Sequence, residues 1–536
     1  MIEVIAHNLA PIMFASLVIV LLLGYPVAFS LAANGLLFFL IAVELAPYSQ
    51  SITLDWPLLG LTAGRVLDVM RNDTLLAVPF FTLMGIVLEK SGMAEDLLDT
   101  AGQLFGPIRG GLAYSVILVG ALLAATTGVV AASVIAMGLI SMPIMLRYGY
   151  DRSLAAGVIA ASGTLAQIIP PSLVLIVLAD QLGVSVGPMY AGAILPGLML
   201  VGLFCLYILA ISIWRPAMVP ALPLAARTLG SGVGSLFLVA IASVAVGFMA
   251  WWILRDRIAQ GAGVWGAASA ALTAYGVAVI DKHLSLGLLS RLAQQVVIVL
   301  IPPLALIFLV LGTIFLGIAT ATEGGAMGAA GALLLAWGKG RLPYATLSEA
   351  LDSTTRLACF VMFILIGSRV FSLTFYGVNG HVWVEELFVG LPGGEWGFLF
   401  AVNILVFILG CFIDFFEIAF IVIPLLAPVA QKFGIDLVWF GIIIGMNMQT
   451  SFLTPPFGFA LFYMRSVAPN GPWLDKPTGR TLAGVTTAQI YRGGVAFIVL
   501  QLIMVGMVMA FPWLSIGEGE KKIDTEKIEI ELPSLD

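Results

Sequence analysis

Small polar residues stand shortly before two Pro-Pro pairs inside long apolar segments of this sequence. One set precedes Pro170-Pro171 and the other precedes or adjoins Pro455-Pro456. In chain order the polar positions are Ser162, Gly163, Thr164, Asn447, Gln449, Thr450 and Thr454. A proline removes one N–H donor and frees the carbonyl one turn earlier. Freed carbonyls with nearby hydroxyl and amide oxygens suit Na⁺, and the amino ends of half-helices attract an anion.

The two breaks belong to a gapless internal repeat. Each residue of the second copy lies 285 positions after its counterpart, as Pro455 does after Pro170. The matched residues are Pro143, Arg147, Tyr148, Gly149, Asp151, Pro170 and Pro171, with Pro428, Lys432, Phe433, Gly434, Asp436, Pro455 and Pro456. A third pair, Pro302-Pro303, lacks this context, so the prolines alone are not diagnostic. Paired breaks at matching positions of two repeats indicate a transporter binding site.

Each copy also has a polar stretch ahead of its basic loop, namely Thr126-Thr127-Gly128 in the first and Asp414 to Glu417 in the second. Backbone without a partner costs several kcal/mol in lipid, so irregular segments there adjoin protein or a water-filled cavity. Ordinary proline kinks are the alternative interpretation of the breaks. Capping of a half-helix is the alternative role for Asp414. The matched pairing favours ion or substrate sites.

The elements that must position these residues are membrane helices. The chain has 536 residues, of which 61% are hydrophobic and 10% charged, and its mean hydropathy is +1.09. A span needs about 20 apolar residues, which leaves room for roughly a dozen. Runs at about 236–254 and 264–280 predict two extra spans, and a last span is expected at 495–513. The acidic end of the chain is expected to be a solvated tail.

Composition also excludes several functions. Lys and Arg are scattered singly, so we expect no nucleic-acid partner. The three histidines, His7, His283 and His381, are far apart and supply no nucleophile–base pair, so we expect no enzyme and no cofactor. The three cysteines, Cys205, Cys359 and Cys411, are expected to be small core hydrophobes. A passive channel is the alternative function from outside the class of coupled transporters.

The motifs resemble those of the large membrane subunit of the TRAP (tripartite ATP-independent periplasmic) transporters. The resemblance covers most of the chain. The segments that carry it are Gly149-Tyr150-Asp151, Ala161 to Thr164, Ile169 to Ser172, Thr320 to Glu323 and Thr454 to Gly458. The run Phe412 to Glu417 resembles the mannitol/chloroaromatic-like or 2-oxoacid-like branch. The chain departs from the family at two places. Its hairpin tip is Thr126-Thr127-Gly128, where many relatives carry a tip of the Ser-Gly-Ser type. The stretch 224–291 is longer than usual, and we expect its extra helices to occupy the place of the small subunit or to pack beside it.

The resemblance implies an all-α polytopic membrane protein with two inverted repeats, re-entrant helical hairpins and broken helices, working as an elevator. The basic loop of the first copy carries Arg147 and Arg152, and the matching loop of the second copy carries only Lys432. This difference in charge does not decide whether the second copy is inverted in the membrane. The implied regions are 1–110 (scaffold helices of repeat 1), 111–188 (first half of the transport domain), 189–293 (scaffold span plus inserted helices), 294–397 (scaffold helices of repeat 2), 398–470 (second half of the transport domain), 471–515 (C-terminal span) and 516–536 (acidic tail).

The resemblance further implies Na⁺-coupled uptake of a small organic acid, a monocarboxylate, 2-oxoacid or related carboxylate, across the bacterial inner membrane. Implied partners are a small membrane (Q) subunit, a periplasmic substrate-binding (P) protein and the bilayer. A free-standing Na⁺/anion symporter is the alternative. The implied substrate- or ion-binding residues are Thr126, Thr127, Gly128, Ser162, Gly163, Thr164, Pro170, Asp414, Asn447, Gln449, Thr450, Thr454 and Pro455. Na⁺ is expected near Thr127, Ser162 and Gly163, and near Asp414, Asn447 and Thr450.

Overall fold

Helices form almost the whole molecule, as the apolar composition predicts. The structure is a computed structural model and describes residues 2–49, 52–230, 232–257 and 261–516; the side chains of residues 2, 126 and 127 and all but the first residue of the expected tail lie outside the described part. Within it, nine helices are long and apolar enough to cross a membrane, or up to 11 if each of two bent pairs is one span. This is close to the dozen expected.

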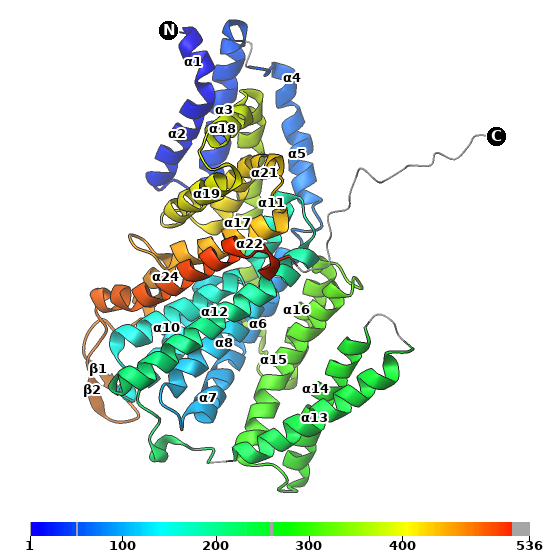
Figure 1. Cartoon of the computed structure of the whole chain (residues 1–536), viewed down its shortest axis with the longest axis vertical. Coiled ribbons are helices and arrows are strands. Elements are labelled where there is room, and N and C mark those ends of the chain that lie inside the picture. The colour runs from blue at the N-terminus through cyan, green and yellow to red at the C-terminus, as the bar shows by residue number, and fades with distance from the viewer. Residues whose placement is uncertain (1, 50–51, 231, 258–260, 517–536) are drawn as a thin grey trace, which may run out of the picture.

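The first helices of the chain form the narrow end of the molecule, with α6 and α7 reaching down beside α8 (Figure 1). Glycines bring α3 close to α17, since a Cβ at Gly35 would lie 2.9 Å from the backbone of Phe371. The bounds are α1 (Ile2–His7), α2 (Leu9–Leu22), α3 (Val27–Leu45), η1 (Ala46–Tyr48), α4 (Trp56–Leu59), α5 (Leu61–Met70), α6 (Ala77–Lys90) and α7 (Met93–Phe105).

The sequence repeat is also a repeat of helix ends. α9 and its counterpart α20–α21 begin at 130 and 415 and end at 147 and 432, and α11 and α23 end at 182 and 467. The first copy is α8 (Gly111–Thr127), α9 (Val130–Arg147), α10 (Arg152–Thr164), η2 (Leu165–Gln167) and α11 (Leu173–Leu182). The second is α19 (Gly394–Gly410), α20 (Phe415–Glu417), the π-helical turn η5 (Ile418–Val422), α21 (Ile423–Lys432), α22 (Leu437–Phe452) and α23 (Phe459–Val467).

The shared Gly-x-Asp loop has the same physical cause in both copies. Gly149 and Gly434 adopt φ values of +82° and +72°, a left-handed conformation that suits glycine after a helix. Two residues later an aspartate begins the next helix: Asp151 accepts from the backbone N–H of Leu154 at 3.0 Å. Asp436 likewise caps α22. The loop therefore fixes how each hairpin passes into its broken helix.

The remaining elements connect and flank these two copies. They are α12 (Val186–Trp214), η3 (Pro216–Met218), η4 (Leu224–Ala226), α13 (Val233–Leu254), α14 (Ala262–Leu284), α15 (Arg291–Phe315), α16 (Ala321–Gly338), α17 (Tyr344–Gly377), α18 (Gly380–Val389), β1 (Trp473–Asp475), β2 (Arg480–Leu482), α24 (Thr487–Ala510) and η6 (Pro512–Leu514).

The two extra spans expected within 224–291 are present as α13 and α14. They pack closely on each other, because a Cβ at Gly247 would lie 2.6 Å from the carbonyl oxygen of Gly266. Figure 1 shows the pair beside α15, away from the rest of the chain. With α15 they form a small apolar core of their own, separate from the main core.

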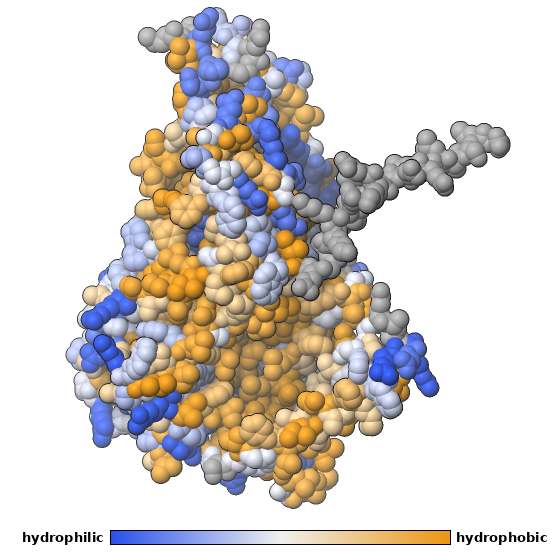
Figure 2. Space-filling view, viewed as in Figure 1, coloured by the Kyte–Doolittle hydropathy of each residue, from blue (hydrophilic) through white to orange (hydrophobic). Residues whose placement is uncertain are grey.

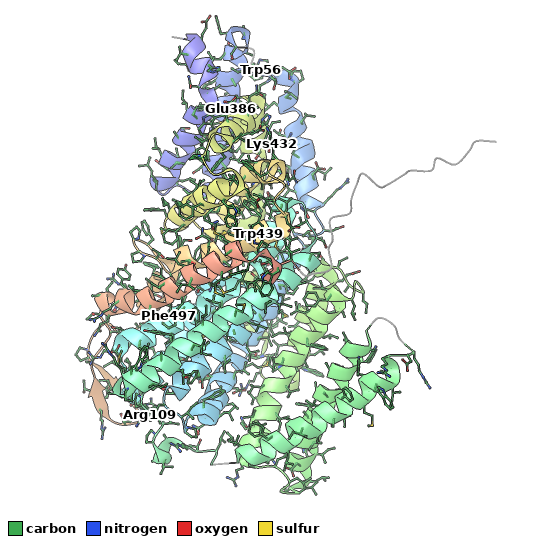
Figure 3. The ribbon with its side chains drawn as sticks, in the orientation of Figure 1. Trp56, Arg109, Glu386, Lys432, Trp439 and Phe497 are labelled. Carbon is green, nitrogen blue, oxygen red and sulfur yellow. The ribbon has the colours of Figure 1, made fainter. Side chains whose placement is uncertain are left out.

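Helix α24 lies along the first copy of the repeat. Gly493 meets α10 so closely that an added Cβ would lie 1.9 Å from the carbonyl oxygen of Ser153. Phe497 packs edge-on against Phe204 of α12, with ring centroids 5.1 Å apart. The indole of Trp439, on α22, donates to the carbonyl of Val508 at 2.8 Å (Figure 3). The C-terminal span is thus packed on both broken helices.

Two features differ from the sequence expectations. The region 471–515, expected as a span, begins with the antiparallel hairpin β1–β2, whose Asp475 pairs with Arg147 at 2.7 Å. Hydrophilic residues gather over this hairpin, whereas hydrophobic residues cover much of the middle of the same face (Figure 2). The cysteines are not all core residues: Cys359 is exposed and Cys205 half-buried, and only Cys411 is buried. An apolar run cannot distinguish a core-facing thiol from one on the outer, lipid-type surface.

Candidate functional site

The tip of each hairpin lies against the break of its own copy. Gly128 follows directly after α8 with φ +59°, and a Cβ there would lie 2.9 Å from the side chain of Leu173, the first residue of α11 after the break. In the second copy Phe412, beside the hairpin tip, packs edge-on against Phe457 in the break, with centroids 5.8 Å apart. Thr126 and Thr127 end α8, but their side chains lie outside the described part.

The first break is enclosed by its own hairpin. Ser162 is fully buried and lies against α8, since a Cβ at Gly120 would be 2.6 Å from the Ser162 Cβ. Gly163 faces α9, where a Cβ would be 3.1 Å from the backbone nitrogen of Val134. The hydroxyl of Ser162 has no hydrogen-bond partner among the described residues. These contacts place Ser162 and Gly163 between the two arms of the hairpin.

The two breaks differ in how they are covered. Pro170 and Ser172 are buried, and the Tyr190 hydroxyl of α12 donates to the Ser172 carbonyl at 3.4 Å. In the second break Thr454 is half-buried and Pro455 exposed. Both Pro-Pro bonds are cis. The second break therefore reaches the surface of this chain, whereas α12 closes the first.

At the second tip, two carboxylates cap a helix reciprocally. Asp414 accepts from the N–H of Phe415 at 2.7 Å, and Glu417 accepts from the N–H of Asp414 at 3.1 Å. Glu417 is 8% exposed and Asp414 is half-buried. Such a capping box satisfies free donors at a helix start. Capping, the alternative role for Asp414, is thus realised, and each carboxylate keeps further lone pairs for a ligand.

The other members of the expected second site make separate hydrogen bonds. Asn447 donates to the Asn403 carbonyl of α19 at 2.6 Å. The Thr450 hydroxyl donates to its own helix at Met446, 3.1 Å away. Both residues are buried in α22, and Asn447 contacts α19, an arm of the second hairpin. Among the described contacts, no hydrogen bond therefore joins Asp414, Asn447 and Thr450 to one another.

The two broken helices meet through residues at matching positions. Gln449 Nε2 donates to Thr164 Oγ1 at 3.3 Å, and the two residues are 285 positions apart, the spacing of the repeat. Thr164 donates its own proton to the Ala161 carbonyl at 2.8 Å. Its oxygen can therefore only accept, which turns the Gln449 carbonyl oxygen away from it. Both side chains are fully buried.

A third member of this contact comes from outside the predicted set. Gln501, in the middle of α24, donates to Thr164 Oγ1 at 3.1 Å and is fully buried. The amide oxygens of Gln449 and Gln501, and both polar atoms of Gln167, lack partners among the described residues. A buried polar atom without a partner costs about 1–3 kcal/mol. An uncharged amide inside a long apolar span was the only sequence signal for Gln501.

The comparisons with known proteins now decide the family. The sequence matches the family described as "Tripartite ATP-independent periplasmic transporter, DctM component" over residues 14–514. The chain belongs to this family. As a DctM component it is a large permease subunit of a TRAP transporter, a multi-pass protein of the inner membrane and not an enzyme.

Named relatives support the same assignment for this DctM-family chain. It is 28% identical over 460 residues to the C4-dicarboxylate TRAP transporter large permease protein of Pseudomonas aeruginosa, covering 85% of this chain and 88% of that protein. It is 26% identical over 506 residues to the sialic acid TRAP transporter large permease protein of Vibrio cholerae, covering 93% and 97%. The branch suggested by the run Phe412 to Glu417 has no support among these relatives.

A solved structure shares the fold. The Alcanivorax borkumensis YdaH transporter superposes with a TM-score of 0.51 at 12% sequence identity, covering 90% of this chain and 99% of that one. At this identity the likeness concerns the fold alone. The DctM-family chain therefore shares the arrangement of its helices with another membrane transporter.

Proposed function

We propose that this permease takes up a small organic acid together with Na⁺. The observation that carries the proposal is the joining of two matched helix breaks through Gln449 and Thr164. Near this contact lie uncharged oxygen atoms that could coordinate a cation. They include the buried Ser162 hydroxyl oxygen and the Gln449 amide oxygen, which lack protein partners in the described part. Neutral oxygens and helix carbonyl ends are ligands that suit Na⁺ in such transporters.

The anion would meet the amino ends of the half-helices that follow the breaks. α11 begins at Leu173 and α23 begins at Phe459, each directly after its break. Neither helix start has a side-chain cap among the described residues. The first N–H groups of a helix have no partner within the helix and carry partial positive charge, which favours a carboxylate. The relatives named for C4-dicarboxylate and sialic acid transport handle carboxylates. We propose a small monocarboxylate or 2-oxoacid for this chain, from the run Phe412 to Glu417.

We assign the movement to the hairpins and broken helices, 111–188 and 398–470, against scaffold helices in 1–110 and 294–397. The C-terminal span joins the moving part in this proposal, because Gln501 and Gly493 tie α24 to α10. A periplasmic binding protein would deliver the solute, and α13 and α14 would pack beside the small membrane subunit or occupy its place.

Uptake by the purified complex in proteoliposomes tests this function. An inward Na⁺ gradient should drive accumulation of a radiolabelled 2-oxoacid only when the binding protein is present. Equal uptake without the binding protein would favour a free-standing symporter. Uptake that ignores the Na⁺ gradient would favour a channel and contradict sodium coupling. Competition by unlabelled C4-dicarboxylate, lactate and sialic acid would then rank the carboxylate classes.

A further inference from the structure

Two prolines in the second hairpin remove donors that helix carbonyls would otherwise use. Pro424 has no N–H, so the carbonyl of Phe420, four residues earlier, has no α-helical donor. Pro428 does the same to the carbonyl of Pro424. The π-helical turn η5 lies at this place, as is common where the regular ladder is interrupted. The hairpin thus offers two backbone acceptors, one turn apart.

Both acceptors are taken by hydroxyls of a single neighbouring helix. Ser368 Oγ, on α17, donates to the Phe420 carbonyl at 2.5 Å. Tyr376 Oη, two turns further along α17, donates to the Pro424 carbonyl at 3.3 Å. Ser368 is 3% exposed, so water competes little for its bond. The Phe360 ring of α17 also packs edge-on against Phe416, with centroids 6.1 Å apart.

Helix α17 also packs tightly on α3, which is not part of the hairpin. A Cβ at Gly367 would lie 2.4 Å from the Ala28 carbonyl oxygen, which shows how closely the two backbones approach. The Thr374 hydroxyl donates to the Gly35 carbonyl at 2.9 Å. Ser368 and Tyr376 therefore lie on a helix that has its own contacts with α3, separate from those it makes with the hairpin.

We propose that Ser368 and Tyr376 are positioning residues, which hold the second hairpin in register with α17 in this arrangement of the permease. Pro424 and Pro428 supply the acceptors for these hydroxyls. The inference rests on the proposed movement of the hairpins past the scaffold. Any such displacement breaks both bonds together, and an unpaired carbonyl at the fully buried Phe420 is costly. The pair thereby sets how long the permease stays in this arrangement.

A reporter at another contact between the same two parts tests this. Asn72 Nδ2, in the loop before α6, donates to Asp180 Oδ1 of α11 at 2.6 Å. Cysteines at these two positions, in a chain whose Cys205, Cys359 and Cys411 are replaced by alanine, can be joined by a short bifunctional thiol reagent. The cross-linking rate then reports the ratio of docked to undocked molecules, without substrate or Na⁺.

Ser368→Ala and Tyr376→Phe should each lower that ratio about five-fold, the change that one typical net hydrogen bond corresponds to. Thr374→Val is the matched control, because it removes a hydroxyl-to-carbonyl bond between α17 and α3 and should leave the ratio unchanged. Pro424→Ala should act like Ser368→Ala by returning an N–H to the Phe420 carbonyl. In the Pro424→Ala background, Ser368→Ala should then lower the ratio of docked to undocked molecules by less than it does in the otherwise unchanged chain.

Equal ratios in the Ser368→Ala/Tyr376→Phe variant and in Thr374→Val would overturn the inference. So would a Ser368→Ala effect of the same size with and without Pro424. The proposed function fails by a different result, namely uptake by the unmodified complex that ignores Na⁺. That result would leave the cross-linking comparison intact, so the two failures are distinguishable.

Discussion

Gln449 donates its side-chain amide to the hydroxyl of Thr164 across 3.3 Å, and the two residues occupy the same position in the two copies of the repeat. Residues at matched positions touch each other only where the copies themselves meet. The contact therefore marks the junction of the two halves of the permease. It lies beside both helix breaks, and Gln501 joins it from the C-terminal span.

Replacing Gln501 by leucine should weaken this junction and reduce Na⁺-driven uptake. The variant removes one donor to Thr164, and a lost buried hydrogen bond of this kind costs about 1 kcal/mol. We expect a lower melting temperature and a higher half-saturating Na⁺ concentration, measured by thermal unfolding and by uptake. Leu502→Ala, at a 44% exposed position of the same helix, is the control and should change neither.

Thr164→Val and Thr164→Ser separate the hydroxyl from the shape of the side chain. Valine keeps the volume but leaves the amides of Gln449 and Gln501 without their acceptor, so uptake should fall several-fold and stability by about 1–3 kcal/mol. Serine keeps the acceptor and should retain most of the uptake. A serine variant as impaired as the valine variant would contradict a role for the hydroxyl.

Ser162→Ala and Thr450→Ala should affect Na⁺-driven uptake more than folding. The Ser162 hydroxyl makes no hydrogen bond within the described part, and the Thr450 hydroxyl bonds only within its own helix turn in the contacts described. A large-to-small substitution in a core lowers the free energy of unfolding by about 2–5 kcal/mol, and removing either of these hydroxyls should lower it by much less. The measurement is the Na⁺ dependence of initial uptake beside the melting temperature. Unchanged Na⁺ dependence in both variants would count against the proposed ion sites.

Asp414 can be tested by separating its capping role from its charge. Asparagine is an N-cap about as good as aspartate, whereas alanine costs about 0.5–2 kcal/mol. Asp414→Asn should therefore keep the melting temperature but lose Na⁺-coupled uptake, and Asp414→Ala should lose both. Full uptake by Asp414→Asn would leave Asp414 as a structural cap only.

The crossing of α24 and α10 should not accept a side chain at Gly493. An added Cβ would lie 1.9 Å from the Ser153 carbonyl, so the helices must separate, and overpacking of this kind costs about 1–3 kcal/mol or more. Gly493→Ala should lower the melting temperature and the yield of folded protein. Gly506→Ala, on the same helix with nothing within 4 Å, should be neutral or slightly stabilising.

Acidification should release the β1–β2 hairpin. Hydrogen bonds from Arg147 hold the pKa of Asp475 below its usual value. The carboxylate therefore stabilises the fold above the unfolded-state pKa of about 4, and this stabilisation is lost as the pH falls through the lower folded-state pKa. The difference in melting temperature between wild type and Asp475→Asn should be largest near neutral pH and shrink below about pH 4.

Sequence alone predicted the breaks because their cause is local. A proline removes a donor wherever it stands, and the Gly-x-Asp loops adopt the same capped turn in both copies. Gln501 and Ser368 could not be found in this way. Each is one polar residue in an apolar helix, and its role depends on which helix packs beside it. That choice is made by close approaches such as Gly493 on α10 and Gly367 on α3.

The β1–β2 hairpin and the exposed Cys359 were missed for related reasons. Asp475 stabilises the hairpin by pairing with Arg147, more than 300 residues away in the chain. Hydropathy cannot register such a pair. For Cys359, an apolar run describes a membrane helix equally well on its packed face and on its outer face. Periodicity within a span would be needed to separate the two.

The meeting of Thr164 and Gln449 also constrains how the gene could change. At matched positions that do not touch, a substitution in one half of the protein leaves the surroundings of its counterpart unchanged. Here a mutation in either copy changes the surroundings of the other, because one residue supplies the donor and its counterpart the acceptor. We therefore expect the residue types at these two positions to change together among relatives more often than those at matched positions that do not touch.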